Sequence, residues 1–125
     1  MATKAKKRKE VTEAKAYVQA RFNNTIVTIT DDQGDPLCWA SAGTCGLKGS
    51  RKGTPHAGTL VAEKATTLAK EFNIKVITII VKGPGQGRDT AARVLIGCPD
   101  WKAKLARDDT GIAHNGCRQR KRRRV

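Results

Sequence analysis

The sequence lacks any apolar run that approaches the 18 or more residues needed by a membrane-spanning helix. Its basic start is also not followed by the apolar segment that is typical of a secretory signal. These two absences predict a soluble, intracellular protein without a membrane partner. We expect it in the cytoplasm, with an organelle as the alternative.

Paired cysteines are lacking as well. The four cysteines Cys38, Cys45, Cys98 and Cys117 contain no Cys-x-x-Cys pair, so a structural zinc site lacks its usual ligand spacing. An intracellular chain keeps its thiols reduced, and we interpret the four as small buried hydrophobic residues. Zinc bound by Cys117 with His114 is a minor alternative, and we expect no metal or other cofactor.

Catalytic motifs are also scarce. Residues 48–50 read Lys-Gly-Ser, the inverse of the phosphate-binding Gly-Lys-Ser order, and the glycines of residues 83–87 miss the dinucleotide spacing. The acids of residues 31–35 lie together in one turn, where they are turn formers rather than separated metal ligands. We therefore expect no catalytic residue. A phosphate-handling hydrolase using Lys82 or Arg88 is the alternative, although no base or nucleophile accompanies them.

Positive charge is what the sequence has in excess. The 125 residues carry a net charge of +14, and residues 1–10 and 118–125 hold eleven of the 25 Lys and Arg residues with one acid, Glu10. Such arms repel themselves unless a polyanion neutralises them. We predict one α/β domain over residues 13–113, between a basic extension, residues 1–12, and a basic arm, residues 114–125.

Hydrophobic patterning outlines this domain. Alternation over residues 14–22, a β-branched run at 25–30 and a third short run at 37–41 predict a three-stranded meander. Thr54 and Pro55 mark the start of a helix over 55–72 that Asn73 ends. The apolar run 75–81 predicts a strand covered on both faces, followed by a helix over 89–96 and an edge strand over 101–107. We expect a mixed sheet with helices packed on it in three layers.

Two loops precede these helices and carry cations. Residues 43–55 place Lys48, Ser50, Arg51 and Lys52 at a helix start, where the macrodipole attracts phosphate. Residues 82–88 join three glycines, whose amides could approach an anion, to Lys82 and Arg88. The alternatives are a solvated loop at the first position and a structural turn at the second.

The C-terminal run, residues 118–124, resembles extensions that fold between RNA segments, although a nuclear-import patch or generic polycation has the same composition. The five aromatic residues form no stacking alternation. We therefore predict readout of RNA shape and phosphates rather than of bases.

Four strings, in consistent order, resemble one protein family. They are Phe-Asn-Asn-Thr-Ile-Val-Thr-Ile-Thr-Asp at 22–31, Lys-Gly-Ser-Arg-Lys at 48–52, Val-Lys-Gly-Pro-Gly at 81–85 with Gly-Arg at 87–88, and His-Asn-Gly-Cys-Arg at 114–118 with Lys-Arg-Arg-Arg-Val at 121–125. Together they look like the bacterial-type small ribosomal subunit protein eleven family. Where that family has prolines, this chain has Gly111 and Ala113, which implies a less rigid entry to the arm.

The resemblance implies a non-catalytic structural component of the small ribosomal subunit with a ribonuclease-H-like topology. It would lie on the platform against small-subunit rRNA, beside neighbouring ribosomal proteins and close to the messenger RNA exit. A chromatin or RNA-chaperone protein is the runner-up. The implied rRNA contacts are Asn23, Asn24, Lys48, Ser50, Arg51, Lys52, Lys82, Gly83, Gly85, Gln86, Arg88, Arg93, His114, Asn115, Arg118, Arg120, Lys121, Arg122, Arg123 and Arg124.

Overall fold

The computed structural model describes residues 12–125, so almost all of the expected basic extension at residues 1–12 lies outside the described residues. The described chain forms five strands, two α-helices and two short 3₁₀ helices. In chain order they are β1 (Glu13–Ala20), β2 (Thr25–Asp31), β3 (Pro36–Ser41), η1 (Gly49–Gly53), α1 (Pro55–Ala69), η2 (Lys70–Phe72), β4 (Val76–Lys82), α2 (Gly87–Ile96) and β5 (Lys102–Asp108).

The predicted helix signals operate in the structure. The Thr54 hydroxyl accepts a hydrogen bond from the Ala57 amide at 3.3 Å, and Pro55 occupies the first helical turn. Asn73 ends η2 in the left-handed region with φ of 52°. The strands and α1 lie within a few residues of their predicted bounds, whereas the loop predicted over 43–55 contains η1.

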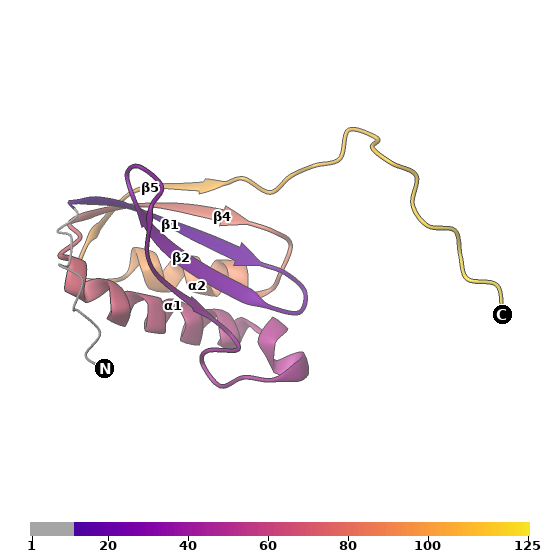
Figure 1. The fold of residues 1–125 in the computed structure, drawn as a ribbon, viewed down its shortest axis with the longest axis horizontal. Helices are drawn as coiled ribbons and strands as arrows, with labels where there is room; N and C mark the ends of the chain where they lie inside the picture. Colours follow the sequence, from indigo (N-terminus) through magenta and orange to yellow (C-terminus); the bar gives the residue numbers. More distant parts are fainter. Residues whose placement is uncertain (1–11) are drawn as a thin grey trace, which may run out of the picture.

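The five strands form one mixed sheet in the order β3-β2-β1-β4-β5 (Figure 1). β1, β2 and β3 are antiparallel neighbours, as the predicted meander requires. β4 returns through α1 to pair in parallel with β1, and α2 leads to β5, which pairs in parallel with β4. The central strand is thus β1, and because β4 runs parallel to it, the carboxyl ends of β1 and β4 lie at the same end of the sheet.

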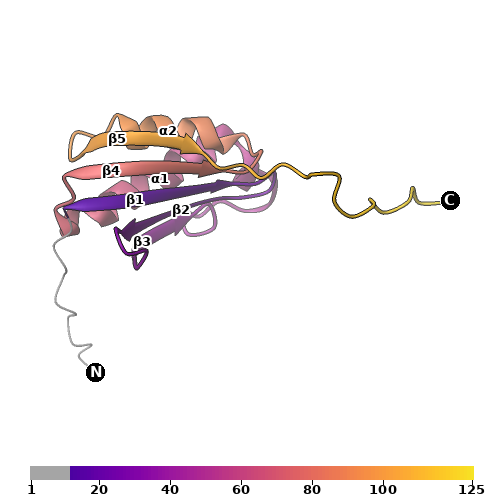
Figure 2. The ribbon, with the colours of Figure 1, turned by 90° about the horizontal axis from the view of Figure 1, so that it is seen from above.

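The domain has two layers, so the predicted three-layer arrangement is wrong. α1 and α2 lie on the same face of the sheet (Figure 2). The two helices touch because Gly58 and Gly87 meet without side chains between them. The other face carries no helix within residues 12–125. Ile80, on that open face, is 5% exposed, and its neighbours across the sheet are Tyr17 and Arg107. Strand neighbours, rather than a second helix layer, therefore account for its burial.

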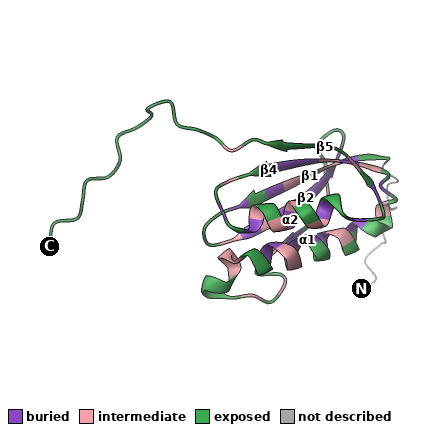
Figure 3. Cartoon of the chain, turned by 180° about the vertical axis from the view of Figure 1, so that it is seen from behind, coloured by how far each residue is buried: buried purple, intermediate pink, exposed green. Residues whose placement is uncertain are grey.

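The core lies between the sheet and the two helices, whose buried residues face the strands (Figure 3). Ile29, Ile77, Ile79 and Leu95 are among its largest fully buried side chains. None of the helices in residues 12–125 is long and apolar enough to cross a membrane.

The cysteines only partly follow the prediction of small buried hydrophobic residues. Cys98 is buried, Cys38 and Cys45 are half-buried, and Cys117 is exposed in the arm, where that prediction is wrong. All four are free thiols. Burial, with a smaller contribution from Glu71, raises the pKa of Cys38 to about 11, so this thiol stays protonated at neutral pH.

Candidate nucleic-acid interface

Four segments that are distant in sequence meet at one end of the sheet, which we call the loop end. They are the turn 21–24 between β1 and β2, η1, the loop 83–86 between β4 and α2, and the chain that follows β5 (Figure 1). The Gly85 amide donates to the Ala20 carbonyl at 2.8 Å, and Gly53 packs on the Phe22 carbonyl. The two cationic loops predicted from the sequence therefore flank the same turn.

Glycine makes this assembly possible at two positions of the 83–86 loop. Gly83 has φ of +103° and lies against the Ala20 carbonyl, and Gly85 lies against the carbonyl of Arg21, so a Cβ at either position would overlap backbone atoms. Their amides are occupied, because Gly83 donates to the Thr110 hydroxyl at 3.2 Å and Gly85 donates to Ala20. The hydrogen bonds from these two amides hold the loop against the rest of the protein. RNA contacts of Gly83 and Gly85 remain a prediction.

The chain after β5 is tied to the same loop by a group of residues that we call the arm clasp: Gly83, Arg88, Asp108 and Thr110. Arg88 forms an ion pair with Asp108, and its other terminal nitrogen donates to the Gly83 carbonyl at 3.4 Å. Asp108 accepts from the Thr110 amide at 3.0 Å. The clasp thus joins the start of α2 to the root of the arm.

The electrostatics of Asp108 reflect the clasp. Hydrogen bonds from the Thr110 hydroxyl and amide, followed by that from Arg88, lower the pKa of Asp108 from 3.8 to about 2. The carboxylate is therefore charged at neutral pH and neutralises Arg88 at the start of α2. Arg88 was predicted as an RNA contact. In the structure its charge is paired with Asp108, and its bond to the Gly83 carbonyl positions the 83–86 loop.

The cations before α1 are presented differently. Lys48, which precedes η1, and Ser50 and Arg51 within η1 are exposed, whereas Lys52 is half-buried. The backbone amide and hydroxyl of Thr54 both reach the Arg51 carbonyl, so η1 is joined directly to the start of α1. This local geometry places exposed positive charge beside a helix N-terminus, an arrangement that favours phosphate.

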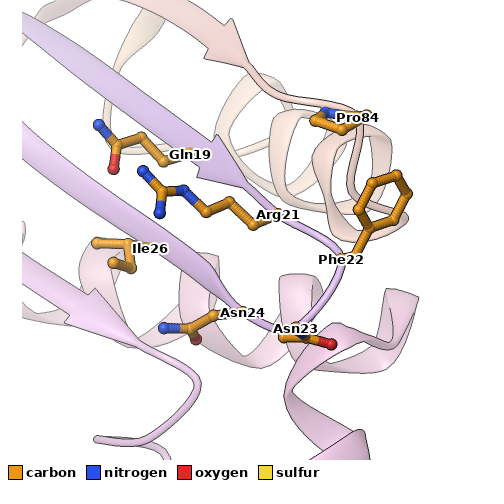
Figure 4. A pocket seen from close by; sticks show the side chains of 7 residues that line it. All are labelled: Gln19, Arg21, Phe22, Asn23, Asn24, Ile26 and Pro84. Atoms are coloured by element: carbon orange, nitrogen blue, oxygen red, sulfur yellow. The ribbon is translucent and has the colours of Figure 1, made fainter. Parts of the chain in front are cut away.

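A groove of about 570 Å³ opens beside the 21–24 turn (Figure 4). Its lining includes both predicted contacts Asn23 and Asn24, and also Arg21 and Phe22, which the sequence analysis did not single out. The Arg21 side chain extends back over the open face of the sheet, whereas Phe22 points outward near Pro84 (Figure 4). Arg21 and Phe22 continue the alternation of β1 into the Asn-Asn turn. An apolar residue directly before that turn was the signal that could have identified this pair as part of a surface site.

The other predicted contacts are dispersed. Gln86, beside the Gly85 contact, is exposed at the loop end, and Lys82 is exposed at the end of β4. Arg93 is exposed in the last turn of α2, about 9 Å along the helix from Gly87 at 1.5 Å per residue.

The basic arm is exposed throughout and extends away from the body (Figure 2). It therefore brings no cation against the loops, although it leaves from the same end of the sheet (Figure 1). Its predicted contacts are His114, Asn115, Arg118, Arg120, Lys121, Arg122, Arg123 and Arg124.

Known proteins resemble nearly the whole chain. The family model described as ribosomal protein S11 matches residues 14–124. The small ribosomal subunit protein uS11 of Hydrogenovibrio crunogenus is 52% identical over 122 residues, covering 98% of this chain and 94% of the relative. The uS11 proteins of Rhodopirellula baltica and Caldicellulosiruptor saccharolyticus are 52% and 50% identical over 118 residues, which is 94% of this chain and 92% and 90% of those relatives.

Proposed function

The chain belongs to the ribosomal protein S11 family, a family of non-catalytic structural proteins of the small ribosomal subunit, and from that premise we propose that it binds small-subunit rRNA through its loop end and basic arm. The observation that carries this proposal is the convergence of two cationic loops and the root of the arm at one end of the sheet. One compact body can thereby present fixed charges while a flexible polycation follows neighbouring backbones.

The two parts have different roles in this mechanism. The exposed cations of η1 sit beside the start of α1 and meet phosphates in a fixed geometry, so they set the orientation of the body. The arm is exposed along residues 111–125 and orders only when RNA phosphates neutralise it. Binding by both parts should be strongly sensitive to salt.

The finer elements of the proposal concern location. They are the platform of the small subunit, neighbouring ribosomal proteins, a position close to the messenger RNA exit, and ribosomes of the cytoplasm. The antiparallel meander followed by two parallel strands supports the ribonuclease-H-like topology within this proposal. All of these rest on family membership.

Sedimentation of the tagged full chain from its own cells tests the proposed function. We expect stoichiometric persistence in the small-subunit peak after a high-salt wash. The matched control is a tagged chain in which the cations at 118–124 are replaced by glutamine. Retention only at low salt, or spreading over nucleic acid of every size, would instead indicate a generic polyanion binder.

A further inference from the structure

Phe22 is unusually exposed for an apolar side chain on a well-fixed turn. It is 73% exposed, the highest value for a large hydrophobic residue in the body, residues 12–108. Trp39 follows at 56%, on an edge strand. Because single exposed apolar side chains are common on protein surfaces, Phe22 indicates a binding surface only together with the fixed turn that carries it and the groove beside it.

The exposure of Phe22 does not come from a loose loop. The Arg21 amide donates to the Asn24 carbonyl at 2.7 Å and closes the turn. Gly53 contacts the Phe22 carbonyl from one side, and Gly85 contacts the Arg21 carbonyl from the other. The ring is thus carried by a backbone that two separate loops hold in place, and a ligand that covers it need not order the turn first.

The groove beside Phe22 combines the groups that recognise a nucleic-acid base. Gln19, Asn23 and Asn24 contribute side-chain amides, which can both donate and accept hydrogen bonds. The side-chain oxygen of Asn24, Oδ1, accepts a hydrogen bond from the Thr25 amide at 2.9 Å, so the side-chain amino group of Asn24 is the part turned towards the groove (Figure 4). Arg21 adds a guanidinium that suits either a phosphate or a stacking plane.

The positive charge of the groove favours an anionic occupant. No carboxylate lines this groove in the described part of the chain, while Arg21 lies in it and Lys82 lies beside it. An unpaired nucleotide supplies a flat apolar face for the ring, a polar edge for the amides and an anionic backbone for Arg21 together.

We propose that this groove holds one unpaired base of the rRNA, stacked on Phe22 and read along its edge by the amides of Asn23, Asn24 and Gln19, with Arg21 on the adjoining phosphate. This inference rests on the proposed function and deepens it. It adds a base-recognition site to an interface that the sequence predicted to read shape and phosphates. The groove volume of about 570 Å³ is within the range of sites for small ligands.

The test compares tagged full-length variants that compete with the untagged protein for small subunits in cells. Phe22→Ala should lower the ratio of tagged to untagged protein in the washed subunit peak by about 5- to 150-fold, the range that follows from the loss of one base–aromatic stack. Phe22→Trp should keep most of the competitiveness, and Phe22→Leu should behave like alanine. Ile96→Ala, on a half-exposed side chain at the far end of α2, is the matched control and should compete normally.

Ultraviolet cross-linking of purified subunits identifies the occupant. We expect the peptide that contains Phe22 to carry a nucleotide, and Phe22→Ala to remove that adduct. The proposal is overturned if Phe22→Ala competes equally and no adduct forms, or if the peptide is instead joined to another protein. The proposed function would fail differently, because the unmodified tagged chain would then be missing from the washed subunit peak.

Thermal unfolding of each purified variant separates binding from folding. Since Phe22 is mostly in solvent, its substitution should leave the unfolding midpoint within the range of the Ile96→Ala control. A variant that loses competitiveness and also unfolds early would be replaced by Asn24→Ala. That substitution removes the amino group from the groove and should produce a smaller loss of competitiveness, whereas normal competition by Asn24→Ala would also overturn the proposal.

Discussion

The helix-covered face of the sheet and its loop end are fixed by different forces. On the covered face, Ile77, Ile79 and Leu95 are fully buried, and their burial holds the helices against the strands. At the loop end few large apolar groups are buried, and the geometry depends on glycines against carbonyls and on the arm clasp. The first region supplies stability and the second supplies shape for binding, so substitutions should separate the two.

Removal of residues 118–125 should have the largest effect, and that effect should be confined to binding. If the full chain neutralises about eight phosphates, the slope of log K against log salt is about −6 to −7, and loss of six cations should reduce it to about −2. The measurement is the affinity for small-subunit rRNA across a salt series. Because these residues are exposed, the unfolding midpoint should not change, and a fall of that midpoint would contradict the separation.

Substitution of Ile79 by alanine should act on stability alone. Its side chain is fully buried between the sheet and the helices, so the free energy of unfolding should fall by about 2–5 kcal/mol in a denaturant titration. Ile80→Ala is the matched control on the open face, and it should cost less because none of the helices in the described residues covers that side. Equal losses for the two variants would show that the covered face is not the main source of stability.

Gly85→Ala should affect both regions because the loop supports binding through backbone packing. A Cβ at Gly85 would overlap the Arg21 carbonyl, so the loop must move off β1 at a cost of about 1–3 kcal/mol. We expect a lower unfolding midpoint together with weaker rRNA binding. Gly111→Ala, where a Cβ would meet no atom within 4 Å, should change neither. Normal binding by Gly85→Ala would show that the loop geometry is unimportant.

The smallest effect is expected at the arm clasp. Asp108→Asn should accelerate hydrogen exchange at the amides of Gly83 and Thr110, because the carboxylate that holds Thr110 and Arg88 is lost. Asp109→Asn makes the same charge change next to the clasp and should leave both amides protected, since Asp109 pairs with Arg107. Equal exchange in the two variants would contradict the clasp.

The clasp also gives a pH dependence with a defined sign. Since the pKa of Asp108 is lowered from 3.8 to about 2 by Thr110 and Arg88, its contribution is fully present above pH 4 and is lost as the pH falls through 2. A titration of the Thr110 amide by NMR should therefore show a transition near pH 2. Asp108→Asn should abolish it, whereas a midpoint close to 4 in the unmodified protein would show that the clasp does not form.

Much of the fold could be predicted because its signals are local. Thr54 and Pro55 locate the start of α1 to the residue, and short runs of alternating, β-branched or apolar residues between turn signals locate the strands within a few positions. The number of layers could not be predicted in the same way. An apolar run indicates that both faces of β4 are shielded, but Ile80 is shielded by neighbouring strands rather than by a helix.

The candidate site likewise has features with a local sequence signal and features that arise only on folding. Cationic loops and the basic arm are visible as composition, so their residues were predicted even though their RNA contacts remain predictions. The pairing of Arg88 with Asp108 joins positions 20 residues apart, and no local pattern indicates that this cation is already neutralised. The groove at Phe22 depends on contacts from Gly53 and Gly85, which exist only after folding.

The parallel pairing of β1 with β4 has a consequence for the newly made chain. It joins residues 63 positions apart, so β1 leaves the ribosome with one edge unpaired until β4 has followed. β5 comes later still, and the basic arm follows β5. The order of synthesis therefore lets the sheet approach completion before the basic arm, through which nucleic acid could capture an unfinished fold, leaves the ribosome.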